Sequence, residues 1–318
     1  MENGIIIALT EKEIDMKKAL IILFCGIIGL LFGCESLVFV REDSGIKHIY
    51  KMGNNGNSQV PFSPITSTPY DYPDVSPDGT KIAYTDGQNV FISDLNDIGG
   101  NSQVQLSTPT GTKSFVRWAP EQQVIGYANF ASGTASIILS ATSGVNHLPA
   151  TYPTGSQSDN GGLDFYLDNN VQYMVYSRNG DLYSMFFNGT QPASPITNTP
   201  GPTILETLPV VSHDSKLLAF RVSYKLAALG TVDHIQVLSI GTWSSQHVIA
   251  MQPPAVRGTI SSIAFSCDDE RLYVAAKTSS TAGSREIFSV KLDGGDQQQL
   301  TNNSVYDSKP DAIPTPCP

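Results

Sequence analysis

Short runs in which apolar and polar residues alternate dominate the chain after residue 36. Examples are 89–95 (NVFISDL), 135–141 (ASIILSA) and 180–186 (GDLYSMF), and such alternation is typical of half-buried β-strands. No apolar spacing of three and four residues continues over a helix length in this region, and 27 Gly and 20 Pro are spread along the chain. The pattern predicts an all-β protein of many short strands joined by turns.

A turn followed by an apolar strand recurs along the chain. The clearest copy, VSPDGTKIAY around Pro77, is followed by copies at residues 120, 169, 213, 267 and 314, at intervals of 43, 49, 44, 54 and 47 residues. A further apolar run follows each of the first five turns and is expected to be the third strand of its unit: 89–95, 135–141, 180–186, 234–240 and 285–292. This period, with several short strands in each unit, is typical of a β-propeller.

One unit is divided between the two ends of the chain. Residues 36–63 supply three strands without a preceding turn, and residues 304–314 supply a first strand and turn with nothing after them. Combining them completes one blade and removes the exposed edges of an open array. We therefore expect a six-bladed propeller of four-stranded antiparallel blades over residues 37–314, closed by strands from both termini, with a tail at 315–318.

The order of elements in each unit resembles a known repeat. A SPDG-type turn, an apolar strand, an IYxxDL-type strand and a GGxxxQLT-type strand resemble the TolB-type, WD40-like propeller repeat over nearly all of residues 37–314. The match is strong in the units at Pro77 and Cys267 and weaker at residues 120 and 169. The resemblance implies a propeller, without the additional N-terminal α/β domain that TolB carries.

The N-terminal segment predicts export. Lys17 and Lys18 precede an uncharged apolar run, Ala19 to Phe32, which fits a secretory signal peptide at 16–33 and is short for the alternative, a transmembrane anchor. Residues 1–15 carry four acidic side chains before the lysine pair. Because that charge is wrong for the start of a signal peptide, we interpret 1–15 as a mis-assigned start, with translation beginning at Met16.

The end of the apolar run resembles the bacterial lipobox. Leu31, Phe32, Gly33 and Cys34 match its pattern of an aliphatic residue, two small residues and a cysteine, although Phe32 is larger than usual. The resemblance implies cleavage between Gly33 and Cys34, lipidation of Cys34 and a short linker at 34–36. Acyl chains on Cys34 would anchor the protein to a membrane. Glu35, which is not the usual Asp retention signal, favours the outer membrane.

Charge and motifs exclude several functions. The net charge is −10, without a Lys/Arg cluster beyond the lysine pair of the signal segment, so nucleic-acid binding is not expected. The five histidines form no metal-ligand motif, and no HExxH, CxxC or GxSxG motif is present; no metal, cofactor or catalytic residue is therefore predicted. His213 takes the proline place of its turn, and acidic pairs such as Asp71 and Asp74 are interpreted as turn formers.

Two cysteines and one group of polar residues remain as candidates. Cys267 and Cys317 lie at turns of neighbouring predicted blades and either form a disulfide or stay free thiols. The first strand of each blade should line the central channel, which puts five residues around one mouth: Tyr70, Asp71, Glu206, Tyr306 and Asp307. This rim would bind a basic or amide-rich partner segment; the alternative is a solvated rim.

These inferences predict a lipid-anchored protein of the bacterial cell envelope and periplasm. Its expected role is to bind another protein or a cell-wall component without catalysis, since no nucleophile motif, metal cluster or cofactor loop is present. One alternative is a propeller enzyme, lyase-like or lactonase-like, whose site is assembled in the central channel from several blades. A carbohydrate-binding propeller is the other alternative.

Overall fold

The computed structural model describes residues 36–108, 110–121, 123–143, 147–156, 162–187, 192–199, 203–226, 230–253, 255, 259–278 and 284–314. All regular structure within these ranges is β-strand, which confirms the predicted class. The described part of the chain contains no helix that is both long enough and apolar enough to cross a membrane.

Four of the sheets each contain four strands that are consecutive in the sequence. The first holds β4 (Asp71–Val75), β5 (Lys81–Thr85), β6 (Val90–Asp94) and β7 (Val104–Gln105). The second holds β8 (Thr112–Trp118), β9 (Val124–Ala131), β10 (Thr134–Ala141) and β11 (His147–Ser156). The third holds β12 (Leu163–Asp168), β13 (Val171–Arg178), β14 (Asp181–Phe186) and β15 (Ser194–Pro195). The fourth holds β16 (Ile204–Val211), β17 (Leu217–Leu226), β18 (Gly230–Ser239) and β19 (Ser245–Ile249).

The remaining sheet has eight strands and joins the two ends of the described chain. One half consists of β20 (Ser262–Phe265), β21 (Arg271–Lys277), β22 (Arg285–Lys291) and β23 (Gln298–Gln299). The other half consists of β24 (Tyr306–Ala312), β1 (Ser36–Asp43), β2 (Ile46–Gly53) and β3 (Val60–Pro61). Strand β1 pairs antiparallel with β24, from Leu37 opposite Ala312 to Glu42 opposite Tyr306. A parallel pairing of Arg285 with Tyr306 links the halves.

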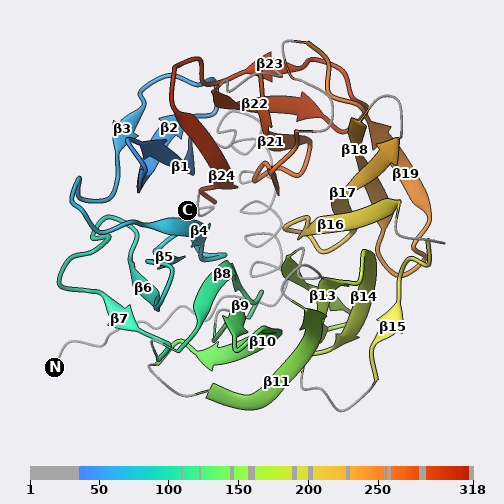
Figure 1. Cartoon of the computed structure of the whole chain (residues 1–318), viewed down its shortest axis with the longest axis horizontal. Helices are drawn as coiled ribbons and strands as arrows, with labels where there is room; N and C mark the ends of the chain where they lie inside the picture. Colours follow the sequence, from blue (N-terminus) through green and yellow to red (C-terminus); the bar gives the residue numbers. More distant parts are fainter. Residues whose placement is uncertain are drawn as a thin grey trace, which may run out of the picture.

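The sheets are arranged around a central axis (Figure 1). Strands β4, β8, β16 and β24 lie nearest the centre, and the last strands, such as β7, β11 and β19, lie at the periphery. The runs expected to be third strands correspond to β6, β10, β14, β18 and β22, each third in the order of its sheet, which confirms that part of the repeat.

The hydrophobic core lies between neighbouring sheets. In β9, Ile125 and Tyr127 pack with residues of β5 and β6, whereas Ala128 and Phe130 belong to the cluster that includes β12 and β13. This division follows from the period of two along a strand, which sends successive side chains to opposite faces of the sheet. Both faces of the second sheet therefore contribute to the core.

Candidate functional site

Several of the innermost strands contain a β-bulge. The pairing register shifts between Asp71 and Asp74 in β4, between Ser114 and Arg117 in β8, and between Thr207 and Val210 in β16. Within these bulges one residue adopts a left-handed backbone: Tyr72 (φ 51°), Phe115 (φ 49°) and Leu208 (φ 58°), and likewise Lys309 of β24 (φ 52°). A bulge re-aims its side chain, and these four residues line a central cavity of about 70 Å³.

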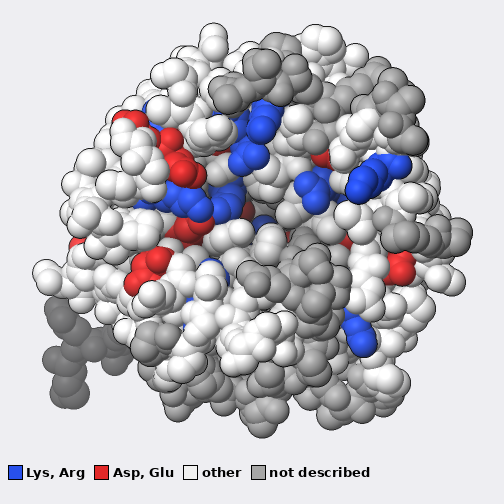
Figure 2. Space-filling view, in the orientation of Figure 1, with Lys and Arg blue, Asp and Glu red and all other residues white. Residues whose placement is uncertain are grey.

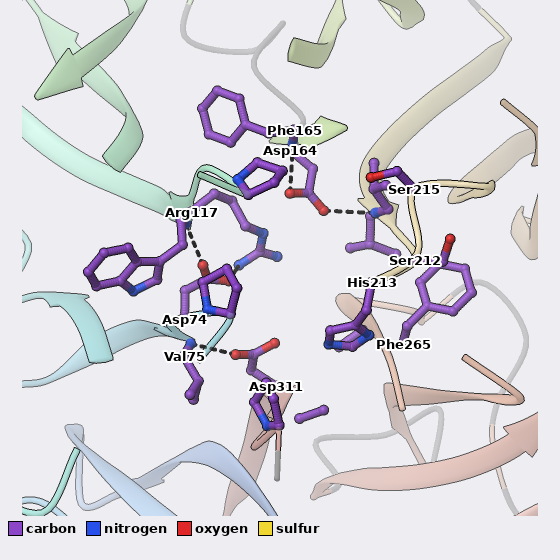
Figure 3. Close-up of a pocket in the computed structure, with 18 of the residues that line it drawn as sticks. Asp74, Val75, Arg117, Asp164, Phe165, Ser212, His213, Ser215, Phe265 and Asp311 are labelled. Carbon is purple, nitrogen blue, oxygen red and sulfur yellow. Dashed lines mark hydrogen bonds and ion pairs between the residues drawn. The ribbon is translucent and has the colours of Figure 1, made fainter. Parts of the chain in front are cut away.

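The residues two positions after the four bulge residues, and the residues at equivalent places in β12 and β20, line a larger cavity of about 310 Å³. From the first sheet onward these positions hold Asp74, Arg117, Asp164, Val210, Ala264 and Asp311. Because the turns after the inner strands surround this cavity, we name it the turn-side mouth. Figure 3 shows three carboxylates, the Arg117 guanidinium and the His213 ring gathered around it.

Each of the three carboxylates accepts a hydrogen bond from the backbone of the following sheet. Asp311 Oδ2 accepts from Val75 N at 2.7 Å, which joins β24 to β4. Asp74 Oδ2 accepts from Trp118 N at 2.6 Å, and Asp164 Oδ2 accepts from Val211 N at 2.8 Å. The bonds join β4 to β8 and β12 to β16, so these side chains connect neighbouring sheets rather than only forming their own turns.

The carboxylates outnumber the cations at this mouth. Arg117 is the only Lys or Arg among the described residues that line it, and its Nη1 lies 3.1 Å from Asp74 Oδ1. Burial raises the pKa of Asp164 to about 6, although the Arg117 charge opposes the shift. Burial also raises the pKa of Asp74 and of Asp311. The mouth therefore holds three buried carboxyl groups beside one guanidinium, and burial opposes the ionisation of all three.

His213 links the turn after β16 to the turn after β20. Asp269 Oδ1 accepts a hydrogen bond from His213 N at 2.9 Å and lies 2.8 Å from His213 Nδ1, while Asp269 Oδ2 accepts from Asp214 N at 3.0 Å. Burial lowers the pKa of His213, but the bond and charge of Asp269 outweigh burial, so its pKa is raised. His213 is an exposed turn residue, as expected, and it also contributes a proton-binding group to the mouth.

Four of the five residues predicted for the binding rim are buried, beginning with Tyr70 and Asp71. Tyr70 is 7% exposed and meets Tyr84 edge to face with ring centroids 5.6 Å apart. Asp71 is buried and ion-paired with Lys47 at 2.7 Å and with Lys309. The two lysines hold the pKa of Asp71 below its usual value, although burial acts in the opposite direction.

The other three rim residues differ in their surroundings. Asp307 is fully buried and binds Arg41 Nε at 2.7 Å, and Glu206 is buried. Tyr306 is exposed, and the Arg285 guanidinium lies 5.8 Å from its ring centroid. Figure 2 shows Lys and Arg gathered around the centre of one face, with Asp and Glu beside them. Binding by this rim stays a prediction.

The turn-side mouth was not among the sequence predictions. Part of its signal was present in the repeat, because the residues three positions before residues 77, 120 and 314 of the aligned turns are Asp74, Arg117 and Asp311. Asp164 lies five positions before the turn residue 169, so this spacing does not find it. In the described part of the chain, no three His, Cys, Asp or Glu side chains are grouped so that they could hold a metal ion. The mouth instead offers acceptors and negative charge to an ammonium, guanidinium or amide group.

The remaining site predictions fall mainly outside the described residues. Cys267 is disulfide-bonded; Cys317, the expected partner, lies outside the described ranges, and so the pairing stays a prediction. Residues 1–35, with Gly33 and Cys34, also lie outside them. The signal peptide and the lipid anchor therefore stay predictions.

Comparison with solved structures identifies the fold. TolB from Acinetobacter baumannii superimposes with a TM-score of 0.70 at 15% identity, over 94% of this chain and 73% of that chain. The chain has a TolB-like β-propeller fold.

A putative TolB from Agrobacterium tumefaciens superimposes with a TM-score of 0.56 at 13% identity, over 86% of this chain and 91% of that chain. An oligogalacturonate lyase in complex with manganese superimposes with a TM-score of 0.54 at 11% identity, over 83% of this chain and 73% of that chain. No family model and no curated protein matches the sequence. At these identities the TolB-like propeller similarity concerns the fold alone.

Proposed function

We propose that this protein is a six-bladed, TolB-like propeller lipoprotein of the cell envelope that binds a protein or a cell-wall component without catalysis. The eight-stranded sheet counts as two blades in this proposal, β20–β23 and β24 with β1–β3. The lipobox-like segment ending at Cys34 supports a lipid anchor. Glu35 supports placement at the outer membrane.

The observation that carries the binding role is how the mouth carboxylates are bonded. Asp74, Asp164 and Asp311 each accept a backbone amide of the next sheet, so these groups are held in place by the fold. With one guanidinium among three carboxylates, the mouth favours a partner segment that carries a positive or NH-rich group. Electrostatic complementarity of this kind provides specificity and speeds association.

A pull-down from detergent-solubilised envelope tests the binding role. The full lipoprotein is compared with Pro77→Arg, which adds a cation at the exposed edge of the mouth. The matched control is Val248→Arg at an exposed position of β19. We expect a stoichiometric partner to be recovered by the wild type and the control and lost with Pro77→Arg. Equal recovery by all three baits would contradict binding at the mouth, and recovery of no partner would contradict the role itself.

The lipid anchor has its own test. Cys34→Ser removes the proposed acylation site, and we expect the protein to move from the membrane fraction to the soluble fraction, because two or more acyl chains provide the stable anchoring. Membrane retention of this variant would contradict the proposal. Mass measurement of the wild-type N-terminus would show the lipid directly.

A lyase-like propeller enzyme is the second candidate. The raised pKa of Asp164, about 6, beside a guanidinium favours it, because a carboxyl group that titrates near neutrality suits proton transfer. The structural similarity to an oligogalacturonate lyase suggests the first substrate to assay. Release of an unsaturated product that is abolished by Asp164→Asn would make this candidate the preferred one.

A further inference from the structure

A third cavity, of about 320 Å³, lies between the third and fourth sheets. Its lining combines residues of β12, β13 and β14 with the turn before β19. We name it the aromatic pocket and define it by Tyr166, Asp168, Tyr173, Phe186 and Trp243. It shares no residue with the turn-side mouth.

The separation of the two cavities follows from the geometry of β12. Phe165 and Leu167 line the turn-side mouth, whereas Tyr166 and Asp168 line the aromatic pocket. Successive side chains of a strand point to opposite faces, so one strand end supplies both cavities. The aromatic pocket therefore opens beside the channel rather than within it.

The four rings support one another. Tyr166 and Tyr173 are stacked, with centroids 5.0 Å apart and planes 7° apart. Trp243 meets Tyr166 edge to face at 5.8 Å, and Phe186 lies 4.6 Å from Tyr173. Tyr173, Phe186 and Trp243 are only half-buried. The pocket is thus a preformed aromatic surface that is still partly accessible.

The backbone at Trp243 is unusual for such a residue. Its φ is 53°, a left-handed conformation that is unfavourable for bulky side chains and that Gly or Asn would adopt more easily. Gly241 of the same turn is also left-handed, with φ 89°. Strained residues of this kind concentrate at functional sites. Trp243 therefore points to a role for its indole ring at this surface.

Asp168 is the only charged residue among the described residues that line the pocket. Asn169 Nδ2 donates a hydrogen bond to Asp168 Oδ1 at 3.0 Å. Within the described ranges no Lys, Arg or His forms an ion pair with Asp168. The aromatic rings present negative π faces. Ring faces and an unpaired carboxylate together are complementary to a cation.

We propose that the aromatic pocket binds an organic cation, an ammonium or guanidinium group. The Trp and Tyr faces would attract the cation through their π systems, and Asp168 would pair with its charge. Such a group is carried by small quaternary ammonium compounds and by Lys or Arg side chains. This site lies outside the mouth that carries the proposed function, and its occupancy does not depend on that function.

Calorimetric titration of the full-length protein tests the proposal. The probes are choline, acetyl-lysine amide and acetyl-arginine amide. The neutral control is the choline isostere in which a tert-butyl group replaces the trimethylammonium group. We expect at least one cation to bind about tenfold more tightly than the neutral isostere. Preference for choline would identify a small ammonium ligand, and preference for an amide probe would identify a side chain. Equal binding of the isostere, or no binding of any cation, would overturn the proposal.

Two variants locate the binding. Asp168→Asn keeps the shape of the pocket and removes its charge, and we expect it to weaken cation binding about tenfold. The matched control is Asp94→Asn at the exposed end of β6, which should leave the affinity unchanged. Trp243→Leu should weaken binding similarly, and its melting temperature would show whether it folds. Unchanged affinity in Asp168→Asn would overturn the proposal even if Trp243→Leu fails to fold.

Discussion

Six equivalent positions of the inner strands line the turn-side mouth, and three of them hold Asp. Arg117 occupies another of these positions. An Asp at this position accepts an amide of the next sheet, as Asp74 does from Trp118 N. Arg117 has no acceptor to offer there, and its guanidinium instead lies among the carboxylates (Figure 3). Burial lowers the pKa of Arg117, but the surrounding carboxylates outweigh burial and raise it. One side chain therefore balances several buried charges.

Arg117→Met should leave these carboxylates without their cation. We expect the free energy of unfolding at pH 7 to fall by about 2–4 kcal/mol, because removing one partner of a buried ion pair leaves uncompensated charge. The matched control, Lys81→Met, breaks an exposed pair with Asp94 and should cost about 0–1 kcal/mol. Urea unfolding of both variants makes the comparison, and equal losses would contradict the buried-charge argument.

Asp164 gives the mouth a dependence on pH. The folded protein keeps the Asp164 proton up to about pH 6, whereas the unfolded chain loses it near pH 4. Between these values the folded state binds more protons, so the Asp164 contribution to the free energy of unfolding falls as pH rises. Asp164→Asn removes this contribution. The stability difference between wild type and variant should therefore shift by about 1–3 kcal/mol between pH 4 and 7, in favour of the variant. A constant difference would contradict the raised pKa.

At the scale of the element, the bulged inner strands set the shape of the channel. Tyr72, Phe115, Leu208 and Lys309 all adopt positive φ values, and each places its side chain at the central cavity. Gly162, directly before β12, lines the same cavity and has a φ of 117°. The same left-handed conformation thus occurs in four inner strands with four different side chains, which gives the channel its uneven lining.

Gly162→Ala tests how closely the inner strands approach one another. A Cβ at this position would lie 3.3 Å from Pro209 Cδ and 3.5 Å from Phe115 Cδ1. We expect a loss of about 2–3 kcal/mol from backbone strain and crowding. Gly133→Ala is the control, because its φ is also positive, at 80°, but its Cβ would meet nothing within 4 Å; it should cost about 1 kcal/mol. Thermal unfolding of both variants measures the difference, and equal costs would show that crowding is unimportant.

At the scale of the whole molecule, the two ends of the described chain meet in one sheet. Strand β24 pairs with β1, and β24 also supplies Asp311 to the turn-side mouth. The site therefore depends on a contact between residues far apart in the sequence. A disulfide at Cys267 lies in the turn after β20, in the half of the same sheet that contains β20–β23.

Cys267→Ser and Cys317→Ser should lower the free energy of unfolding by the same amount, about 2–4 kcal/mol. The double variant should lose no more than either single variant, because one bond is removed in each case. Peptide mapping without reduction should recover the linked Cys267–Cys317 peptide. A free thiol at Cys317 would contradict this pairing.

The strands were more predictable than the site. The run 285–292 predicted β22 almost to the residue, because alternation is a local property of the chain. The prediction was six four-stranded blades. The structure has five hydrogen-bonded sheets, because the pairing of Arg285 with Tyr306 joins two of the predicted units in one eight-stranded sheet. For the predicted rim, the sequence correctly placed Asp71 and Asp307 at the starts of inner strands. It did not indicate that Lys47, Lys309 and Arg41 would pair with them.

The sequence by itself determined the class, the repeat and the strand order, because each depends on side-chain periodicity and turn residues within a few positions. Only the tertiary structure decided the chemistry of the two cavities. Asp74, Asp164 and Asp311 come together only when sheets distant in sequence surround one axis, and burial there changes their pKa. Trp243 reaches Tyr166 only because the third and fourth sheets are neighbours. Desolvation and neighbouring charge are properties of the assembled fold, and no local pattern contains them.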